Sequence, residues 1–330
     1  MGCRRIAVVF ILLFAMFSAS GCGKNAREKE LTPVTIAFQE WVGYGLFYLA
    51  EDKGFMADEG VDLLFVDEQL DSARRDAFKA GMLDVEAGTM DLLISKRAQG
   101  APVVGVMVID KSYGSDGIVA DGDIKRIADL AGKRVLLARD DVGETFFLWL
   151  LSKENLTLED VIIVSANPDK IAKLFIEGVG DAAVTWEPEL SRAAEKPGAH
   201  ILVTTREKPG IIVDILNVRE DIVKNNPELV RKLIRGWFKA LEYYEAHPEE
   251  ASTSIAGYFG LTPEVYRKQV EGLKWISYGD QVDLFSKGEI QKTFNVIVGI
   301  KHDNKKISVL PDPGEAFNAD ILKGAHEDSK

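Results

Sequence analysis

The stretch "VTIAFQEWVGYGLFYLAEDKGF", residues 34–55, joins a β-like apolar run to a helical pattern. The apolar run has the length of a strand, and the helical pattern covers residues 46–53. Residues 39–45, between the two, contain two glycines and two large aromatic residues. A strand that leads into a helix is the repeating unit of α/β proteins, so this stretch predicts an α/β fold.

The segment between the strand and the helix is predicted to be a ligand-contacting loop at the strand's tip. Gly43 and Gly45 let the backbone turn and approach a ligand closely. Trp41 and Tyr44 offer flat faces with polar edges. The alternative is that Trp41 or Tyr44 only closes the top of the core.

Further runs of strand length alternate with helical patterns along the chain. These runs span residues 61–66, 101–109, 133–138, 161–166, 199–205 and 211–218. The alternation predicts mostly parallel sheets. After Glu220 the pattern changes, because Asn226 and Thr262 are each followed by a proline, as at a capped helix start. We therefore expect the C-terminal third to be mainly helical.

Two segments resemble each other: "FKAGMLDVEAGTMD", residues 78–91, and "FIEGVGDAAVTWEP", residues 175–188. In each, a helical pattern ends at a glycine, an aspartate turns the chain, and a short buried strand follows. Ligands of open α/β sheets bind at the carboxyl ends of strands. We therefore place Met90, Trp186 and Glu187 in the candidate site. The alternative is that such units occur in any α/β protein.

Two further segments each combine a glycine and an aspartate with an apolar run. They are "YGSDGIVA" with Asp116 and "KPGIIVDILNV" with Asp214. If they carry the chain from a first lobe to a second and back, they form a hinge between lobes that close on a ligand. The predicted first lobe comprises residues 33–117 plus 215–330, and the second lobe comprises residues 118–214. The alternative for both aspartates is a turn or hinge role.

The chain resembles the substrate-binding proteins of ABC importers, in the family that includes binders of sulfonates, taurine, nitrate and thiamine-precursor pyrimidines. The resemblance continues through "DGIVADGDIKRIADLAGKRVLL" (116–137) and "GVGDAAVTWEPELS" (178–191) to "PGIIVDILNV" (209–218). It implies a two-lobed α/β periplasmic-binding-protein fold, type II-like, with two hinge crossovers and a helical C-terminal segment. It also implies a small-molecule solute, an ABC permease and its ATPase subunit as partners, and no cofactor. We expect a monomer.

The charge of the solute is predicted from the residues near the cleft. Most of the charged residues near the predicted cleft are acidic, namely Glu40, Asp116, Glu187 and Asp214. The nearby basic residues, Lys111 and Arg139, each have an aspartate beside them. A sulfonate or nitrate site would want an unpaired guanidinium or a bare helix N-terminus.

The second-lobe helix that starts near residues 140–147 already carries Asp140, Asp141 and Glu144 at its positive end. Aromatic faces with carboxylates suit a cation or an N–H-rich solute, such as a guanidinium compound, an amine or a pyrimidine. The alternative is an aliphatic sulfonate, taurine or nitrate.

The N-terminus has the layout of an export signal. Residues 1–21 combine a basic start, a short apolar run and small residues, and "ASGC" resembles a bacterial lipobox with alanine in place of the usual leucine. We therefore expect lipid attachment at Cys22, a tether over residues 22–32, and an exported protein anchored to a membrane at its periplasmic or cell-surface face. A plain secretory signal is the alternative. Cys3 and Cys22 are the only cysteines, so the mature chain has no disulfide.

Several function classes are disfavoured by the composition. Removal of the leader takes the formal net charge from −12 to −14, which argues against a nucleic-acid partner. The four histidines are scattered without metal-ligand spacing, and no nucleophile elbow or phosphate loop is present, so neither a metal site nor an enzyme is expected. The remaining alternative is an enzyme that uses Glu40 and Glu187 as a pair of carboxylates for glycoside hydrolysis.

Overall fold

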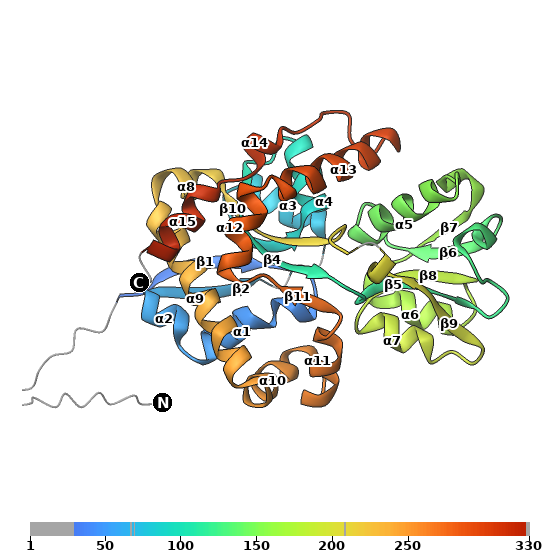
Figure 1. The fold of residues 1–330 in the computed structure, drawn as a ribbon, viewed down its shortest axis with the longest axis horizontal. Helices are drawn as coiled ribbons and strands as arrows, with labels where there is room; N and C mark the ends of the chain where they lie inside the picture. The colour runs from blue at the N-terminus through green and yellow to red at the C-terminus, as the bar shows by residue number, and fades with distance from the viewer. Residues whose placement is uncertain (1–29, 67, 69, 208, 328–330) are drawn as a thin grey trace, which may run out of the picture. The chain divides into compact units, whose positions relative to one another are not determined.

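The computed structural model describes residues 30–66, 68, 70–207 and 209–327. The predicted leader, Cys22 and the tether up to residue 29 lie outside the described residues. The described chain forms two β-sheets flanked by helices (Figure 1). No helix in this part of the chain is long and apolar enough to cross a membrane.

The first sheet has the order β11-β4-β10-β3-β1-β2. Its strands are β1 (Thr32–Ala37), β2 (Val61–Val66), β3 (Val85–Thr89), β4 (Val103–Ser112), β10 (Val213–Arg219) and β11 (Leu273–Trp275). β1 pairs in parallel with β2 and β3, whereas β10 is antiparallel to both β3 and β4. The strand β10 therefore returns from the second sheet and inserts between two strands of the first.

The second sheet has the order β7-β6-β8-β5-β9. Its strands are β5 (Asp116–Asp121), β6 (Arg134–Leu137), β7 (Ile162–Ser165), β8 (Ala182–Trp186) and β9 (Ala199–Thr204). Here β5, the strand that enters from the first sheet, inserts antiparallel between β8 and β9. The order β7-β6-β8-β5-β9 thus repeats the order β2-β1-β3-β10-β4. β3 and β8, which carry the two similar sequence segments, occupy equivalent places.

The helices before residue 195 lie between strands, and in the described chain those after residue 219 follow one another with β11 as the one strand among them. The first group is α1 (Gly45–Asp52), α2 (Phe55–Glu59), α3 (Asp71–Lys79), α4 (Met90–Ala98), α5 (Val142–Lys153), α6 (Pro168–Ile176) and α7 (Glu189–Ala194). The second group is α8 (Glu220–Asn225), α9 (Pro227–Ala246), α10 (Pro248–Ala256), α11 (Pro263–Val270), α12 (Tyr278–Ser286), α13 (Glu289–Asp303), α14 (Pro313–Ala316) and α15 (Ala319–Glu327). Short 3-10 helices are η1 (Val42–Tyr44), η2 (Ile127–Leu130), η3 (Leu158–Asp160), η4 (Thr205–Glu207) and η5 (Gly257–Phe259).

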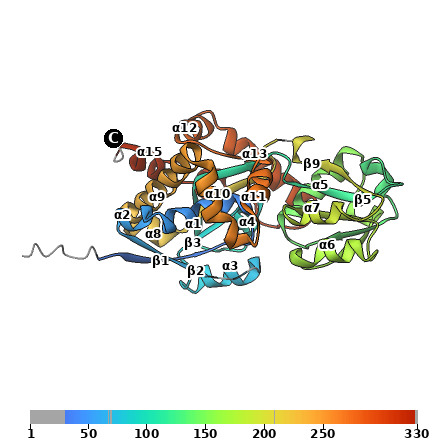
Figure 2. The ribbon, with the colours of Figure 1, turned by 90° about the horizontal axis from the view of Figure 1, so that it is seen from below.

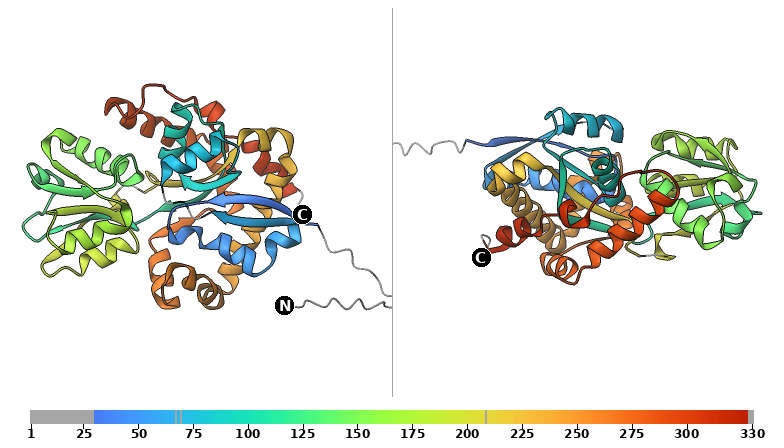
Figure 3. Two further views of the ribbon diagram at one scale, coloured as in Figure 1. Left: turned by 180° about the vertical axis from the view of Figure 1, so that it is seen from behind. Right: turned by 90° about the horizontal axis from the view of Figure 1, so that it is seen from above.

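The C-terminal helices pack mainly on the first lobe, which comprises the first sheet and its helices. α1 contacts both α9 and α10, and α2 contacts α9; Figure 3 shows the blue N-terminal helices beside gold and orange helices of the C-terminal third. The predicted caps are confirmed, since the Asn226 side chain accepts a hydrogen bond from the Leu229 N–H and Thr262 accepts one from Val265. α5, α6 and α7 flank the second sheet in the second lobe (Figure 2). α13 contacts both α4 of the first lobe and α5 of the second.

The glycines of the predicted loop have a packing role that differs from the expected one. Residues 42–44 form η1, and α1 begins at Gly45 with an ordinary helical φ of −54°. A Cβ on Gly43 would lie 2.3 Å from Asp110 Oδ2 and 2.4 Å from Trp41 Nε1. A Cβ on Gly45 would lie 2.5 Å from a methyl group of Ile255. The glycines therefore admit core side chains, while a close approach of this backbone to a ligand stays a prediction.

Gly43→Ala should lower the free energy of unfolding by about 1–3 kcal/mol, because the added methyl group forces Asp110 or Trp41 to move in a packed site. Chemical denaturation of the purified variant measures the change. Gly279→Ala is the matched control, since a Cβ at that helical position meets nothing within 4 Å. An equal effect of the two substitutions would contradict this account of residues 39–45.

Candidate ligand-binding cavity

A cavity lies where the ends of the two crossing strands meet the loop after β1. Asp116 at the start of β5 is paired in register with Trp186 at the end of β8. Asp214 on β10 is paired in the same way with Thr89 at the end of β3. The similar topology of the two sheets thus brings an aspartate and a strand tip from each lobe to one place.

The lining of this inner cavity includes five of the predicted site residues. It consists of the aromatic residues Trp41, Tyr44 and Trp186, the polar residues Gln39, Thr89, Asp116 and Asp214, and the apolar residues Val142 and Ile212. The cavity leaves about 10 Å³ of space, which is about the room that one water molecule needs. A larger solute therefore requires Trp186 to move or the lobes to separate.

An outer chamber of about 370 Å³ lies on the other side of Trp186. Its lining combines first-lobe residues with residues from the start of α6 and α7, and it includes Gln39, Glu40, Leu70, Asp169, Trp186 and Glu189. The Trp186 indole N–H donates to the Glu40 carbonyl oxygen at 3.2 Å. Trp186 therefore separates the two spaces and links the second lobe to the loop after β1.

Two buried carboxyl groups lie side by side at the inner cavity. The Tyr44 hydroxyl donates to Asp214, and the Trp41 indole N–H donates to Asp110 Oδ2 at 3.2 Å. Burial raises the pKa of Asp110 to about 7. Burial and the adjacent Asp110 charge raise the pKa of Asp214 well above its usual range. Because carboxylates only accept hydrogen bonds, a proton must be shared when these two groups bond to each other.

Sequence reasoning missed Asp110. It noted Lys111 and an aspartate beside it, but it assigned no role to that aspartate. In the structure Asp110 is fully buried, while Lys111 is partly exposed and pairs in register with Lys274 on β11. Strand alternation predicts that adjacent residues face opposite sides of a sheet, and this was the available signal.

A third buried carboxyl group, Asp116, belongs to the same cluster. Burial raises its pKa to about 8, and the charges of Asp214, Asp141 and Glu187 add to the effect of burial. Its Oδ2 atom is buried without a hydrogen-bond partner. Within residues 30–66, 68, 70–207 and 209–327, none of Asp110, Asp116 and Asp214 forms an ion pair.

The hydrogen-bond donors of the lining are committed to acceptors within the protein. The Thr89 hydroxyl donates to Asp91 Oδ1 at 2.6 Å, and Trp41, Tyr44 and Trp186 donate as described above. Apart from the protons that the three carboxyl groups with raised pKa hold, the polar atoms that remain toward the cavity are mainly acceptors. Gln39, whose amide can donate or accept, is the exception among the lining side chains.

The cations next to the cavity are neutralised by carboxylates. Lys301 on α13 donates to Asp91 Oδ2 at 3.1 Å and to the Thr145 hydroxyl at 3.2 Å, so the buried lysine joins helices of both lobes. Arg139 and Lys306 lie 3.1 and 2.7 Å from the Glu144 carboxylate. The prediction that acidic residues occupy the start of α5 is confirmed, because Asp141 is its N-cap.

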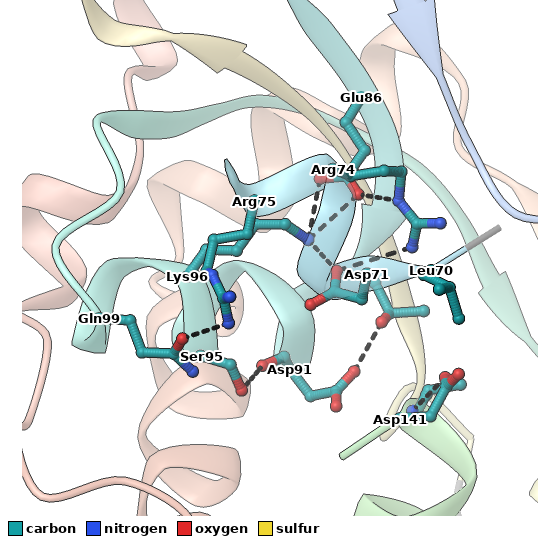
Figure 4. A network of polar contacts seen from close by, with 12 residues as sticks. Leu70, Asp71, Arg74, Arg75, Glu86, Asp91, Ser95, Lys96, Gln99 and Asp141 are labelled. Atoms are coloured by element: carbon teal, nitrogen blue, oxygen red, sulfur yellow. Dashed lines mark hydrogen bonds and ion pairs between the residues drawn. The ribbon is translucent and has the colours of Figure 1, made fainter. Parts of the chain in front are cut away.

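A buried ionic network behind the cavity neutralises two further cations (Figure 4). Arg74 Nε lies 2.6 Å from Glu86 Oε1, and the Lys96 ammonium lies 3.0 Å from Glu86 Oε2 and also pairs with Asp71. Arg74, Glu86 and Lys96 are each at most 1 % exposed. Asp141 lies near this network, and burial raises its pKa to about 6.

Three predicted site residues lie outside the inner cavity. Met90 is fully buried at the start of α4 and is part of the core. The Glu187 carboxylate accepts hydrogen bonds from the backbone N–H and hydroxyl of Ser191, at 3.1 and 2.8 Å, at the start of α7. Glu40 lines the outer chamber. Trp41 and Tyr44 are buried core residues that also line the inner cavity, and their contact with a ligand stays a prediction.

The two similar sheets joined by two crossing strands, with a cavity at the strand tips, define the two-lobed periplasmic-binding-protein fold. The periplasmic aliphatic sulphonate-binding protein SsuA of Escherichia coli has the same fold, with a TM-score of 0.71 and 16% identity over 87% of this chain and 92% of that chain. The model of the family described as NMT1/THI5 like matches residues 42–251, more than half of the chain. The chain belongs to this family.

Two sequence relatives have different names. A Bacillus subtilis (strain 168) protein named "Putative aliphatic sulfonates-binding protein" is 27% identical over 257 residues, covering 74% of this chain and 76% of its own length. The 4-amino-5-hydroxymethyl-2-methylpyrimidine phosphate synthase of Candida albicans (strain WO-1) is 24% identical over 219 residues, covering 62% of this chain and 64% of its own. These names concern a sulfonate in one case and an aminopyrimidine in the other.

Proposed function

We propose that the protein is the extracytoplasmic solute-binding component of an ABC importer, tethered to a membrane by a lipid at Cys22. The fold, the family and the cavity at the strand tips support this proposal. A solute would contact both lobes only when they are closed, so its binding energy would shift the population toward closure. The first lobe would comprise residues 33–117 plus 215–330, and the second would comprise residues 118–214. The lobes would pivot near Gly117 and Asp214 and present the closed form to the permease.

The solute class that best fits the cavity is a cation or a donor-rich nitrogenous compound. One observation carries this proposal: Asp110, Asp116 and Asp214 are buried together without an ion pair in the described chain, while the aromatic donors are already committed. A guanidinium, amine or aminopyrimidine brings the N–H groups that these acceptors lack. The faces of Trp41, Tyr44 and Trp186 would add cation–π or stacking contacts.

An aliphatic sulfonate is the second candidate, because the Bacillus subtilis relative and the SsuA structure are named for such ligands. A sulfonate brings only acceptors and a negative charge. In the present arrangement it would have to accept hydrogen bonds from protonated carboxyl groups, or recruit a cation now paired with Glu86, Asp91 or Glu144. The Candida relative is named a synthase. If this chain were also an enzyme, it would convert a bound compound.

A thermal-shift panel tests the proposed solute class. The purified protein is heated with methylguanidine, alkylamines, 4-amino-2-methylpyrimidine, taurine, an alkyl sulfonate or nitrate. A ligand at 100 times its dissociation constant adds about 2.7 kcal/mol of stability. We expect stabilisation by one of the nitrogenous compounds. Stabilisation by taurine or a sulfonate alone would contradict the proposed solute class, and conversion of a compound would contradict a pure binding role.

Trp186→Ala should weaken solute binding by about 1–3 kcal/mol, because it removes the wall between the inner cavity and the outer chamber. Trp186→Phe is the matched variant, since it keeps an aromatic ring but loses the hydrogen bond to the Glu40 carbonyl and part of the indole surface. Titration calorimetry with the best compound of the panel compares the affinities. If Trp186→Ala instead lowers the unfolding free energy by the roughly 3–5 kcal/mol of a core aromatic, Trp186 is a core residue only.

A further inference from the structure

A second pocket lies on the first lobe, apart from the inner cavity. It has a volume of about 340 Å³ and is lined by residues of the first lobe and the C-terminal helices. Aromatic rings from four separate segments form most of its wall, namely Phe38, Tyr48, Phe65, Tyr258 and Phe259. It shares no lining residue with the inner cavity, and it meets the outer chamber at Glu40. Its size is within the range of small-molecule sites.

The aromatic wall is held in place before any ligand arrives. Tyr48 stacks on Tyr258 with ring centroids 4.0 Å apart and planes 5° from parallel. The rings of Phe65 and Phe38 also pack on Tyr48, with ring centroids 4.8 and 5.5 Å away, and the Phe38 ring is T-shaped to it. The Tyr258 hydroxyl donates to Asp52 Oδ1 at 2.7 Å. These contacts fix the orientation of the rings, so binding would cost little side-chain entropy.

The rim of the pocket leaves large apolar side chains exposed. Tyr258 is 51% exposed, and Phe65 and Val66 are 37% and 41% exposed. An exposed aromatic cluster around a concave site is typical of a binding surface, because a role in core packing would bury it. The rings are therefore available to a ligand on one side and supported by the protein on the other.

The charge around the pocket selects the kind of ligand. Glu40 is the charged residue of the described lining, and the Asp52 carboxylate lies at the rim, where it accepts from Tyr258 and Ser254. No lysine or arginine is among the described lining residues. Aromatic faces carry a partial negative charge, so they and the carboxylates attract the same ligands. A positively charged ligand with apolar substituents satisfies both features.

We propose that this aromatic pocket is a second binding site, separate from the cleft, for a small organic ammonium ion with apolar substituents. The aromatic faces would hold the alkyl or aryl groups, and Glu40 and Asp52 would supply the opposite charge. The site does not depend on the solute that the inner cavity takes.

The test uses choline as the probe and its neutral isostere, 3,3-dimethylbutan-1-ol, as the matched compound. Titrations followed by the NMR signal of the probe's methyl groups measure the affinity of the purified protein for each. We expect saturable choline binding and weaker binding of the isostere. Tyr258→Leu and Phe65→Leu should each weaken choline binding by about 2- to 30-fold, the range of a cation–π contact.

Two control variants locate the bound probe. Tyr278→Leu replaces a tyrosine on α12 that does not line the pocket, and Asp214→Asn alters the inner cavity. Tyr278→Leu should leave choline binding unchanged, and Asp214→Asn should leave unchanged the component of choline binding that Tyr258→Leu weakens. The proposal would be overturned if choline showed no saturable binding, or if the neutral isostere bound equally well. It would also be overturned if choline binding were lost in Asp214→Asn and retained in Tyr258→Leu.

Discussion

Glu86→Gln should lower the free energy of unfolding by about 3–5 kcal/mol, the usual cost of removing one partner from a buried ion pair. Glu86 is fully buried and pairs with both Arg74 and Lys96, which are themselves at most 1 % exposed (Figure 4). The glutamine keeps the shape of the side chain but leaves two buried cations with Asp71 as their remaining carboxylate. The shift of the midpoint in chemical denaturation measures the loss.

Glu220→Gln provides the control for this prediction. Glu220 also pairs with an arginine, Arg97, at 2.7 Å, but its side chain is 48% exposed. An exposed ion pair contributes about 0–1 kcal/mol, so this variant should unfold close to the wild-type midpoint. A loss of the same small size for Glu86→Gln would contradict the view that the network behind the cavity stabilises the first lobe.

Asp214→Asn should raise the free energy of unfolding of the ligand-free protein at pH 8, and it should remove part of the pH dependence of that free energy. In the wild type, burial and the neighbouring carboxyl groups raise the pKa of Asp110 to about 7, of Asp116 to about 8, and of Asp214 well above its ordinary range. The folded protein therefore holds more protons than the unfolded chain between about pH 4 and pH 8, and its stability falls as pH rises through that range. The amide removes one of the interacting charges.

The same variant should weaken the binding of a cationic solute by about 10- to 100-fold, the range for a lost hydrogen bond to a charged group. The Tyr44 hydroxyl can still donate to the amide oxygen, so the cavity keeps its shape. Denaturation at pH 5 and pH 8 measures the first effect, and titration calorimetry measures the second. Wild-type stability that rises from pH 5 to pH 8 would contradict the arrangement of the three aspartates.

Most of the fold could be predicted from the sequence because its signals are local, but the prediction of mostly parallel sheets is wrong, since the crossing strands β5 and β10 are antiparallel to both of their neighbours. Strand-length runs, capped helix starts at Asn226 and Thr262, and the repeated glycine-aspartate turns each depend on a few neighbouring residues. Gly81 and Gly178, which end the two similar helices, both adopt positive φ, as the sequence pattern requires. The resulting equivalence of β3 and β8 placed Trp186 and the two crossover aspartates at one cavity.

The rest of the site depends on contacts between distant segments. Asp110 was missed because β4 is buried on both faces, so the apolar pattern of the strand does not show which side faces the cavity. Glu187 was expected to face the solute, but Ser191, four residues later, supplies it with two local donors. Met90 lies one residue beyond the strand tip, where the first turn of α4 directs it into the core. The commitment of each aromatic donor to an acceptor is visible only in three dimensions.

A cavity next to three buried carboxyl groups should exchange protons with the solvent when it captures a donor-rich, positively charged or nitrogenous solute. Titration calorimetry measures this proton exchange. The best compound of the panel is titrated at pH 7 in buffers of different ionisation enthalpy. A cation, and to a smaller extent an N–H donor, favours the ionised form of the carboxyl groups, so we expect a net release of protons that is reduced in Asp214→Asn. Net uptake of protons, or no net exchange, would contradict the proposed solute class, because an anion leaves the carboxyl groups protonated as donors.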